Sequence, residues 1–244
     1  YLQQILELYA EKKFHPLLEE IEELLKKFPF SIDLHNVSGL AFTHLEKFDF
    51  AIESYQKALK ISPRNAGILL NIGNAFQTMN NFPEAINSYK KAIKIAPNDS
   101  KVHNNLGNAF SKNGNYNSAL NSFEQSVLID HLNYEAYYNM GETLRRKGKF
   151  SKAIISFKQS IKINPNFAEA YNNLGTVFDA MGNRDLAIKN FKKALHLKPD
   201  FAEAHNNFGI TLADIGNKEE AIESYNKALK LKPNYAEAHR NIST

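Results

Sequence analysis

The hydrophobic positions of this chain recur at the spacing of a helix. Within residues 168–201, Tyr171, Leu174, Gly175 and Phe178 stand at i, i+3, i+4 and i+7, which places them on one face of a helix. The remaining positions of this stretch are mostly polar. This pattern predicts a helix that packs one apolar face against a neighbour and leaves the other face to solvent.

A second helical pattern follows after a short interruption. Gly182 and Asn183 lie at the break, where glycine is favoured just past a helix end and asparagine at the start of the next helix. Pro199 ends the second pattern because proline cannot continue a helix. The stretch therefore predicts a helix–turn–helix, and we expect Gly175 to lie where the two helices cross closely, against positions such as Ala187.

The same unit is written repeatedly along the chain. "AEAYNNLG" from Ala168 is followed by "AEAHNNFG" from Ala202. The two copies begin 34 residues apart. Prolines and glycines recur at this spacing of 34 residues or at twice it: Pro29, Pro63, Pro97, Pro165, Pro199 and Pro233, and Gly39, Gly73, Gly107, Gly141, Gly175 and Gly209. Units of this kind bury their apolar faces against one another, so the period predicts a stacked array.

The repeated pattern resembles the tetratricopeptide repeat (TPR). Its elements are aromatic-x-x-Leu-Gly-x-x-Phe, then Gly, then Ala-x-x-x-Phe-x-x-Ala, then Pro, at the TPR period of about 34 residues. We predict one array over residues 1–244: a divergent repeat 1–31, full repeats 32–65, 66–99, 100–133, 134–167, 168–201 and 202–235, and a truncated repeat or cap 236–244. The resemblance implies an all-α, right-handed superhelical solenoid whose first helices line a concave groove.

The sixth position of the repeats carries an asparagine that packing does not require. These residues, called the asparagine ladder below, are Asn71, Asn105, Asn139, Asn173, Asn207 and Asn241. The TPR resemblance implies that they face the groove, and the array is similar to the TPR region of O-linked N-acetylglucosamine transferases, where such a ladder lines the groove. Each amide has one acceptor and two donors for the backbone of an extended peptide. The alternative is that these asparagines are ordinary polar groove residues.

Other candidate ligand-binding residues lie near the ladder. Asn74 and Asn108 are one helical turn further along their helices, and Tyr138 occupies a fifth position that carries asparagine in most of the other full repeats. We expect Tyr138 to be an anchor for a ligand. Alternatively, its ring packs on a neighbouring repeat.

Basic residues form a further candidate site. Arg145 and Arg146 stand near the end of a first helix, and Lys112 stands one repeat earlier. Arginine forks bind carboxylates well, so an acidic ligand segment is one interpretation. The other is that cations in a last helical turn complement the helix dipole.

Four histidines share one repeat position: His35, His103, His205 and His239. Adjacent repeats separate such residues by about 8–10 Å, too far for shared zinc ligands at about 2 Å from the metal. We therefore interpret them as core residues. The chain has no cysteine and no phosphate loop, nucleophile elbow or HExxH motif, so we expect no metal, no cofactor and no catalysis.

Composition adds little to this picture. The net charge is +4 and 43% of residues are hydrophobic, so neither nucleic acid nor a membrane is an expected partner. Without a signal peptide, we expect a cytoplasmic protein.

The predicted function is a protein–protein interaction module that binds an extended peptide or partner segment in its groove. The chain lacks an initiator Met and stops within a repeat, which suggests the alternative of a substrate-recognition arm of a larger glycosyltransferase or sulfotransferase. Self-association through the open C-terminal repeat around Ile242 is a further expectation.

Overall fold

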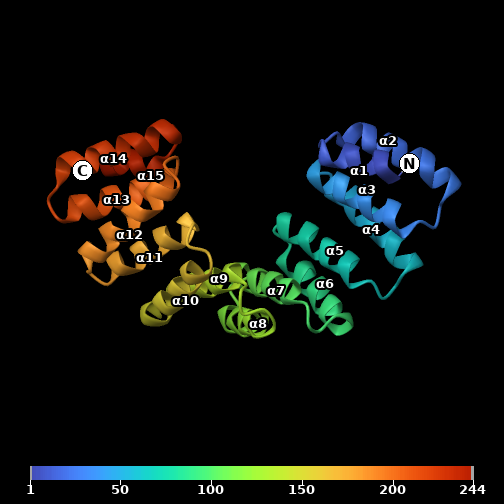
Figure 1. Cartoon of the computed structure of the whole chain (residues 1–244), viewed down its shortest axis with the longest axis horizontal. Coiled ribbons are helices and arrows are strands. Elements are labelled where there is room, and N and C mark those ends of the chain that lie inside the picture. The colour runs from blue at the N-terminus through green and yellow to red at the C-terminus, as the bar shows by residue number, and fades with distance from the viewer. Residues whose placement is uncertain (1, 243–244) are drawn as a thin grey trace. The chain divides into compact units, whose positions relative to one another are not determined.

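A computed structural model describes residues 2–242, all of whose regular structure is helical (Figure 1). The helices are α1 (Leu2–Ala10), α2 (Phe14–Lys27), α3 (Ile32–His44), α4 (Phe48–Ile61), α5 (Ala66–Thr78), α6 (Phe82–Ile95), α7 (Ser100–Lys112), α8 (Tyr116–Ile129), α9 (Tyr134–Arg146), α10 (Phe150–Ile163), α11 (Ala168–Ala180), α12 (Arg184–Leu197), α13 (Ala202–Asp214), α14 (Lys218–Leu231) and α15 (Ala236–Ile242). The first helices α3, α5, α7, α9, α11 and α13 begin at the residues where the sequence places the starts of the repeats.

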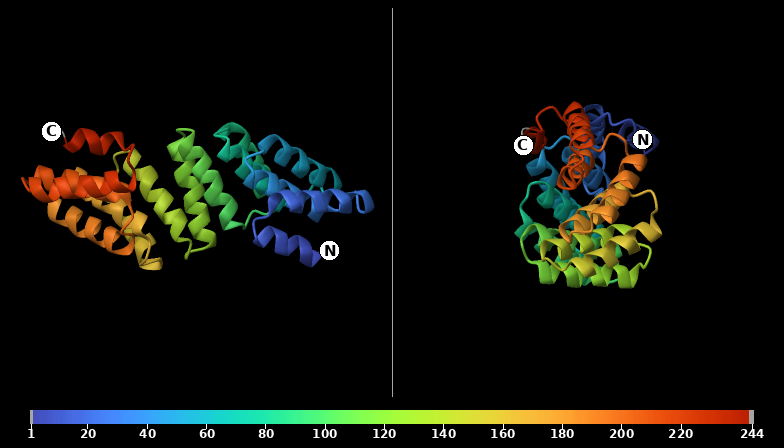
Figure 2. Two further views of the ribbon diagram at one scale, coloured as in Figure 1. Left: turned by 90° about the horizontal axis from the view of Figure 1, so that it is seen from above. Right: turned by 90° about the vertical axis from the view of Figure 1, so that its left-hand side faces the viewer.

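The chain divides into two compact units, residues 1–129 with α1–α8 and residues 130–244 with α9–α15. Within each unit, consecutive helices form hairpins that pack on the next hairpin (Figure 2). The odd-numbered helices also contact one another within a unit, α3 with α5 and α5 with α7 in the first, and α9, α11, α13 and α15 in succession in the second. The all-α solenoid of helical hairpins is therefore confirmed, while its handedness and the single continuous array stay predictions.

The helix ends have local causes. Asn65 and Asn183 cap α5 and α12, because their side-chain oxygens accept hydrogen bonds from the backbone N–H of Ile68 and Leu186. These bonds satisfy N–H groups that have no partner inside the helix. The predicted role of Asn183 as a cap is confirmed.

The turns within the hairpins contain a residue in the left-handed conformation. Gly182 has φ 77°, and the other glycines of its series are similar. Earlier in the chain, Lys12, Glu46 and Asn80 adopt φ of 57–58° at the equivalent position. The turn therefore imposes this backbone even where a side chain makes it unfavourable.

Each repeat's close helix crossing places a glycine against an aromatic ring. A Cβ atom at Gly175 would lie 2.8 Å from Cε1 of Phe191, whose side chain is buried. The ring of Phe191 is thus the nearest partner of Gly175, a contact that the sequence pattern does not predict, while the expected approach to Ala187 stays a prediction. The same aromatic position is filled in the other repeats by Tyr55, Tyr89, Phe123, Phe157 and Tyr225.

Candidate functional site

The asparagine ladder is a set of hydrogen bonds between repeats. Asn71 Nδ2 donates to Asn36 Oδ1 across 2.9 Å, linking α5 to α3. Asn207 Nδ2 donates to Asn172 Oδ1 across 3.1 Å, linking α13 to α11. In both cases a sixth-position amide binds the fifth position of the preceding repeat, so the bond ties neighbouring first helices together.

The ladder adapts where the preceding repeat offers no acceptor at its fifth position. Where the fifth position does hold an asparagine the usual bond forms, as when Asn241 Nδ2 donates to Asn206 Oδ1 across 3.0 Å. Asn105 would meet Leu70 there, and its Nδ2 instead donates to Asn74 Oδ1 across 2.9 Å. Because Leu70 cannot accept a hydrogen bond, the ninth position serves as the acceptor.

One donor of each of these ladder amides is therefore engaged, whereas we expected both donors to be available to a ligand. That part of the expectation was wrong. The carbonyl Oδ1 atoms of Asn71, Asn105 and Asn207 receive no hydrogen bond from the described residues, and all three side chains are partly exposed. These three residues thus present acceptors more than donors, whereas Oδ1 of Asn173 accepts a hydrogen bond from Asn172 Nδ2 across 3.2 Å. Asn139 occupies the same position of α9 and is also partly exposed.

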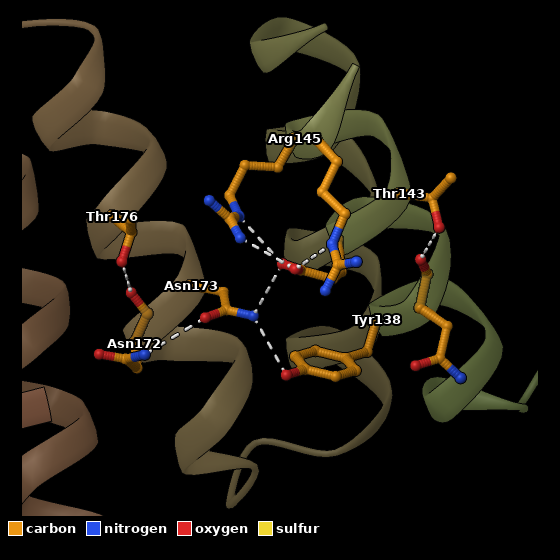
Figure 3. Close-up of polar contacts among 9 residues, drawn as sticks. Tyr138, Thr143, Arg145, Asn172, Asn173 and Thr176 are labelled. Atoms are coloured by element: carbon orange, nitrogen blue, oxygen red, sulfur yellow. Dashed lines mark hydrogen bonds and ion pairs between the residues drawn. The ribbon is translucent and has the colours of Figure 1, made fainter. Parts of the chain in front are cut away.

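Tyr138 takes part in the ladder of the second unit (Figure 3). Asn173 Nδ2 donates to Tyr138 Oη across 3.1 Å and to Glu142 Oε2 across 3.3 Å. The Tyr138 ring lies 4.9 Å from the Phe167 ring and 5.9 Å from the Phe157 ring. Burial, with a smaller effect of Glu142, raises the pKa of Tyr138 to about 12. The packing alternative thus describes what Tyr138 does in this structure.

Glu142 organises the basic residues of α9. Arg145 donates to both carboxylate oxygens, each across 2.9 Å, and Arg146 Nε donates to Oε1 across 2.9 Å (Figure 3). Burial acts to raise the pKa of Glu142, but the hydrogen bonds from the two arginines outweigh it and hold that pKa below its usual value. Arg145 and Arg146 are therefore paired within their own helix, which argues against the two open forks expected for an acidic ligand.

Sequence reasoning missed Glu142, although a signal was present. A carboxylate three and four residues before two arginines lies on their side of the helix. The other candidates belong to the first unit. Lys112 is exposed at the end of α7, and Asn108 is partly exposed on the same helix. Asn74 is engaged, because it also accepts a hydrogen bond from Tyr89 Oη across 2.8 Å.

A second polar cluster that sequence reasoning missed lies further along α11 and α13. Thr211 Oγ1 donates to Asp179 Oδ1 across 2.7 Å. Arg184 forms ion pairs with Asp179 and Asp214, at 3.2 Å and 2.8 Å. These contacts again join adjacent repeats, so polar residues of the odd-numbered helices stabilise the stack.

The four histidines of the shared position have a structural partner. Each imidazole Nε2 lies 2.9–3.0 Å from the carbonyl oxygen of the proline six residues earlier: His35 with Pro29, His103 with Pro97, His205 with Pro199 and His239 with Pro233. His35 is buried and His239 is exposed, so the core interpretation fits His35 alone. Over residues 2–242, no group of three or more His, Asp or Glu side chains is arranged to hold a metal ion.

No helix within residues 2–242 has both the length and the apolar character needed to cross a membrane.

Family models match much of the chain. A model described as TPR repeat matches residues 39–80, 78–114 and 141–182. Models described as tetratricopeptide repeat match residues 172–236 and 100–130. No curated protein matches the chain.

Solved structures resemble the chain in fold. MamA is 33% identical, with 68% of this chain and 96% of MamA covered and a TM-score of 0.60. YrrB, described as "a TPR protein with an unusual peptide-binding site", is 24% identical, with 79% and 100% covered and a TM-score of 0.60. A tetratricopeptide repeat protein from Parabacteroides merdae is 17% identical, with 99% and 96% covered and a TM-score of 0.79.

Proposed function

The chain belongs to the tetratricopeptide repeat family, and from this premise we propose that it binds an extended segment of a partner protein along the asparagine ladder. The repeats and the similar structures support a protein-interaction scaffold as its general role. The observation that carries the finer proposal is the pair of unengaged Oδ1 acceptors at Asn71 and Asn105 on neighbouring first helices of the first unit, with an equivalent unengaged Oδ1 at Asn207 in the second unit.

The hydrogen bonds between repeats prepare these acceptors. Because Asn207 Nδ2 is held by Asn172, the amide plane has a defined orientation before any ligand arrives. A group that is already ordered loses less conformational entropy on binding. The inter-repeat bond and the ligand-binding role are therefore compatible, since they use opposite ends of one amide.

The spacing of the ladder suits an extended backbone. Packed helices lie about 8–10 Å apart, and a polyproline II chain repeats every three residues, or about 9 Å. A ligand in that conformation would present backbone N–H groups at the spacing of the neighbouring acceptors of Asn71 and Asn105. The ladder would then read the backbone, and side-chain contacts beside it would supply selectivity.

The energetic scale is modest. Each hydrogen bond from a ligand N–H contributes about 0.5–1.5 kcal/mol net, so the two neighbouring acceptors of the first unit supply about 1–3 kcal/mol. This is enough to set the register of a peptide but not to bind it alone. The peptide-binding site of YrrB, which has a similar fold, supports a peptide as the class of ligand.

A peptide-display selection tests the proposal. Peptides enriched on the wild-type chain would be resynthesised and titrated against Asn71→Ala, Asn105→Ala and Asn207→Ala combined, with Asn226→Ala, an exposed residue of α14, as the control. We expect the triple variant to bind at least about tenfold more weakly and the control to bind normally. Equal binding by all three proteins would contradict the proposal.

The recognition arm of a larger enzyme, the likeness to O-linked N-acetylglucosamine transferases, self-association near Ile242 and the cytoplasmic location stay predictions.

A further inference from the structure

Three hollows recur at equivalent places in the repeats, each between two even-numbered helices and above the odd-numbered helix between them. The hollow of α2, α3 and α4 has a volume of about 420 Å³, and that of α6, α7 and α8 about 470 Å³. The third, formed by α10, α11 and α12, is about 660 Å³. We call this last one the α10–α12 groove.

The floor of the α10–α12 groove is apolar. Leu174 and Phe178 of α11, both buried, line its base, and the more exposed apolar side chains that line it are Tyr171 of α11, which is partly exposed, and Leu186 of α12, which is 37% exposed. At 3.6 residues per turn, these α11 residues lie on the opposite side of the helix from the ladder residue Asn173. The groove is therefore a surface separate from the asparagine ladder.

The rim of the groove is basic. Lys158 of α10 and Lys189, Lys192 and Lys193 of α12 line it, and all four side chains are exposed. No Asp or Glu lines the groove, and none of these lysines forms an ion pair with a carboxylate of the described residues. Four cations without a carboxylate partner, placed around an apolar floor, create a positive potential that favours an anionic partner.

The fold does not need these lysines. The position of Lys189 is occupied by Asn121 in the α6–α8 hollow, two repeats earlier, and by Glu53 in the α2–α4 hollow, four repeats earlier. The position of Lys158 is occupied by Glu22 in the α2–α4 hollow. The same geometry thus carries an acidic rim in the α2–α4 hollow, two lysines without a carboxylate in the α6–α8 hollow, and four lysines in the α10–α12 groove, so its charge is free to select a partner.

We propose that the α10–α12 groove binds an acidic amphipathic helix of a partner protein. The apolar stripe of such a helix packs on Tyr171 and Leu186, and its flanking carboxylates pair with the lysines on the two rims. The apolar floor favours a peptide helix over nucleic acid, whose outer surface is a phosphate backbone. This binding does not depend on the ladder.

The probe is a labelled synthetic helix of about four turns with leucine at i, i+3, i+4 and i+7 and glutamate beside it. Its affinity would be measured by fluorescence anisotropy for the wild-type chain and for Lys189→Asn combined with Lys193→Gln. These substitutions install the residues of the α6–α8 hollow, Asn121 and Gln125, so the fold should persist, as circular dichroism would verify. We expect about five- to tenfold weaker binding by the variant.

Three controls make the outcome decisive. A scrambled peptide of the same composition and a single-stranded oligonucleotide should each bind more weakly than the amphipathic helix, and the ladder variant with Asn71, Asn105 and Asn207 changed to alanine should bind the helix normally. Equal affinity of wild type and lysine variant would overturn the proposal. So would equal binding of the scrambled peptide or the oligonucleotide. A wild-type dimer that the lysine variant dissociates would identify a second copy as the occupant and overturn the partner assignment.

Discussion

The side-chain nitrogen of Asn207 donates to the side-chain oxygen of Asn172 across 3.1 Å, and this contact joins the first helices of two adjacent repeats. The side chain of Asn172 is buried, so its oxygen depends on this donor for a partner. The ladder therefore contributes to the stability of the stack as well as to the surface that we propose for ligands.

Replacing Asn207 by Asp should destabilise the chain. The change keeps the size of the side chain but replaces the donor Nδ2 by a carboxylate oxygen, which then faces the acceptor Oδ1 of Asn172. We expect the free energy of unfolding to fall by about 1–3 kcal/mol, measured by chemical denaturation followed by circular dichroism. Asn226→Asp, on the exposed surface of α14, is the matched control and should change stability by less than about 0.5 kcal/mol. Equal effects of the two changes would show that the Asn207–Asn172 bond contributes nothing.

Glu142 should make stability depend on pH. Its folded-state pKa is lowered by Arg145 and Arg146 against the effect of burial, so the folded chain binds fewer protons there than the unfolded chain. The contribution is then fully present above the unfolded pKa of about 4.3 and is lost as the pH falls through the folded-state pKa. The stability difference between wild type and Glu142→Gln should be largest near neutral pH and shrink below about pH 4. A difference between wild type and Glu142→Gln that stays flat from neutral pH to below about pH 4 would refute the expectation.

Gly175→Ala should be costly because the new Cβ would lie 2.8 Å from the Phe191 ring. We expect a loss of about 1–3 kcal/mol in the free energy of unfolding. Combining the change with Phe191→Leu should give a smaller loss than the sum of the two single changes, because the shorter side chain makes room.

Gly67→Ala supplies the contrast, because its Cβ would meet only Asn65 Oδ1, at 3.4 Å, in the first turn of α5. It should be neutral or stabilise the chain by up to about 1 kcal/mol. A Gly175→Ala variant as stable as Gly67→Ala would contradict the packing described for the helix crossing.

Glu46→Gly should stabilise the first unit. Glu46 has φ 57°, whereas Gly114 holds the equivalent turn two repeats later with φ 80°. Removing the side chain relieves a left-handed backbone that costs about 1 kcal/mol for a residue with a Cβ, so we expect a melting temperature that is higher by a few degrees. The reciprocal change, Gly114→Glu, should lower it, and effects of the same sign would be inconsistent with this explanation.

The helix boundaries could be predicted because their causes are local. Gly182, Asn183 and Pro199 act on the backbone within one or two residues of themselves, so the pattern of a single repeat suffices to find them. The partner of Gly175 could not be found in this way. It depends on how two helices cross, and that crossing brings the ring of Phe191 closest to the glycine.

The candidate site likewise has one part that the sequence predicts and another that depends on how the repeats pack. The positions of the ladder asparagines follow from the repeat, but the hydrogen-bond partner of each amide depends on the neighbouring repeat. Asn105 shows this, because it binds Asn74 where the fifth position holds Leu70. The interpretation of Arg145 and Arg146 as open forks for an acidic ligand left out Glu142, the carboxylate one turn before them. Glu142 was within reach of a local pattern, because ion pairs at i, i+3 and i, i+4 are a property of the helix itself.

Backbone methylation of a bound peptide tests the central claim most directly. A peptide selected on the wild-type chain would be synthesised with each backbone nitrogen methylated in turn, which removes one N–H and leaves the side chains unchanged. The account predicts that affinity falls about three- to tenfold at nitrogens spaced by one ladder step and little elsewhere. It also predicts that these losses disappear in the variant with Asn71, Asn105 and Asn207 changed to alanine. Affinity that is indifferent to methylation at every position would contradict a ladder that reads the backbone.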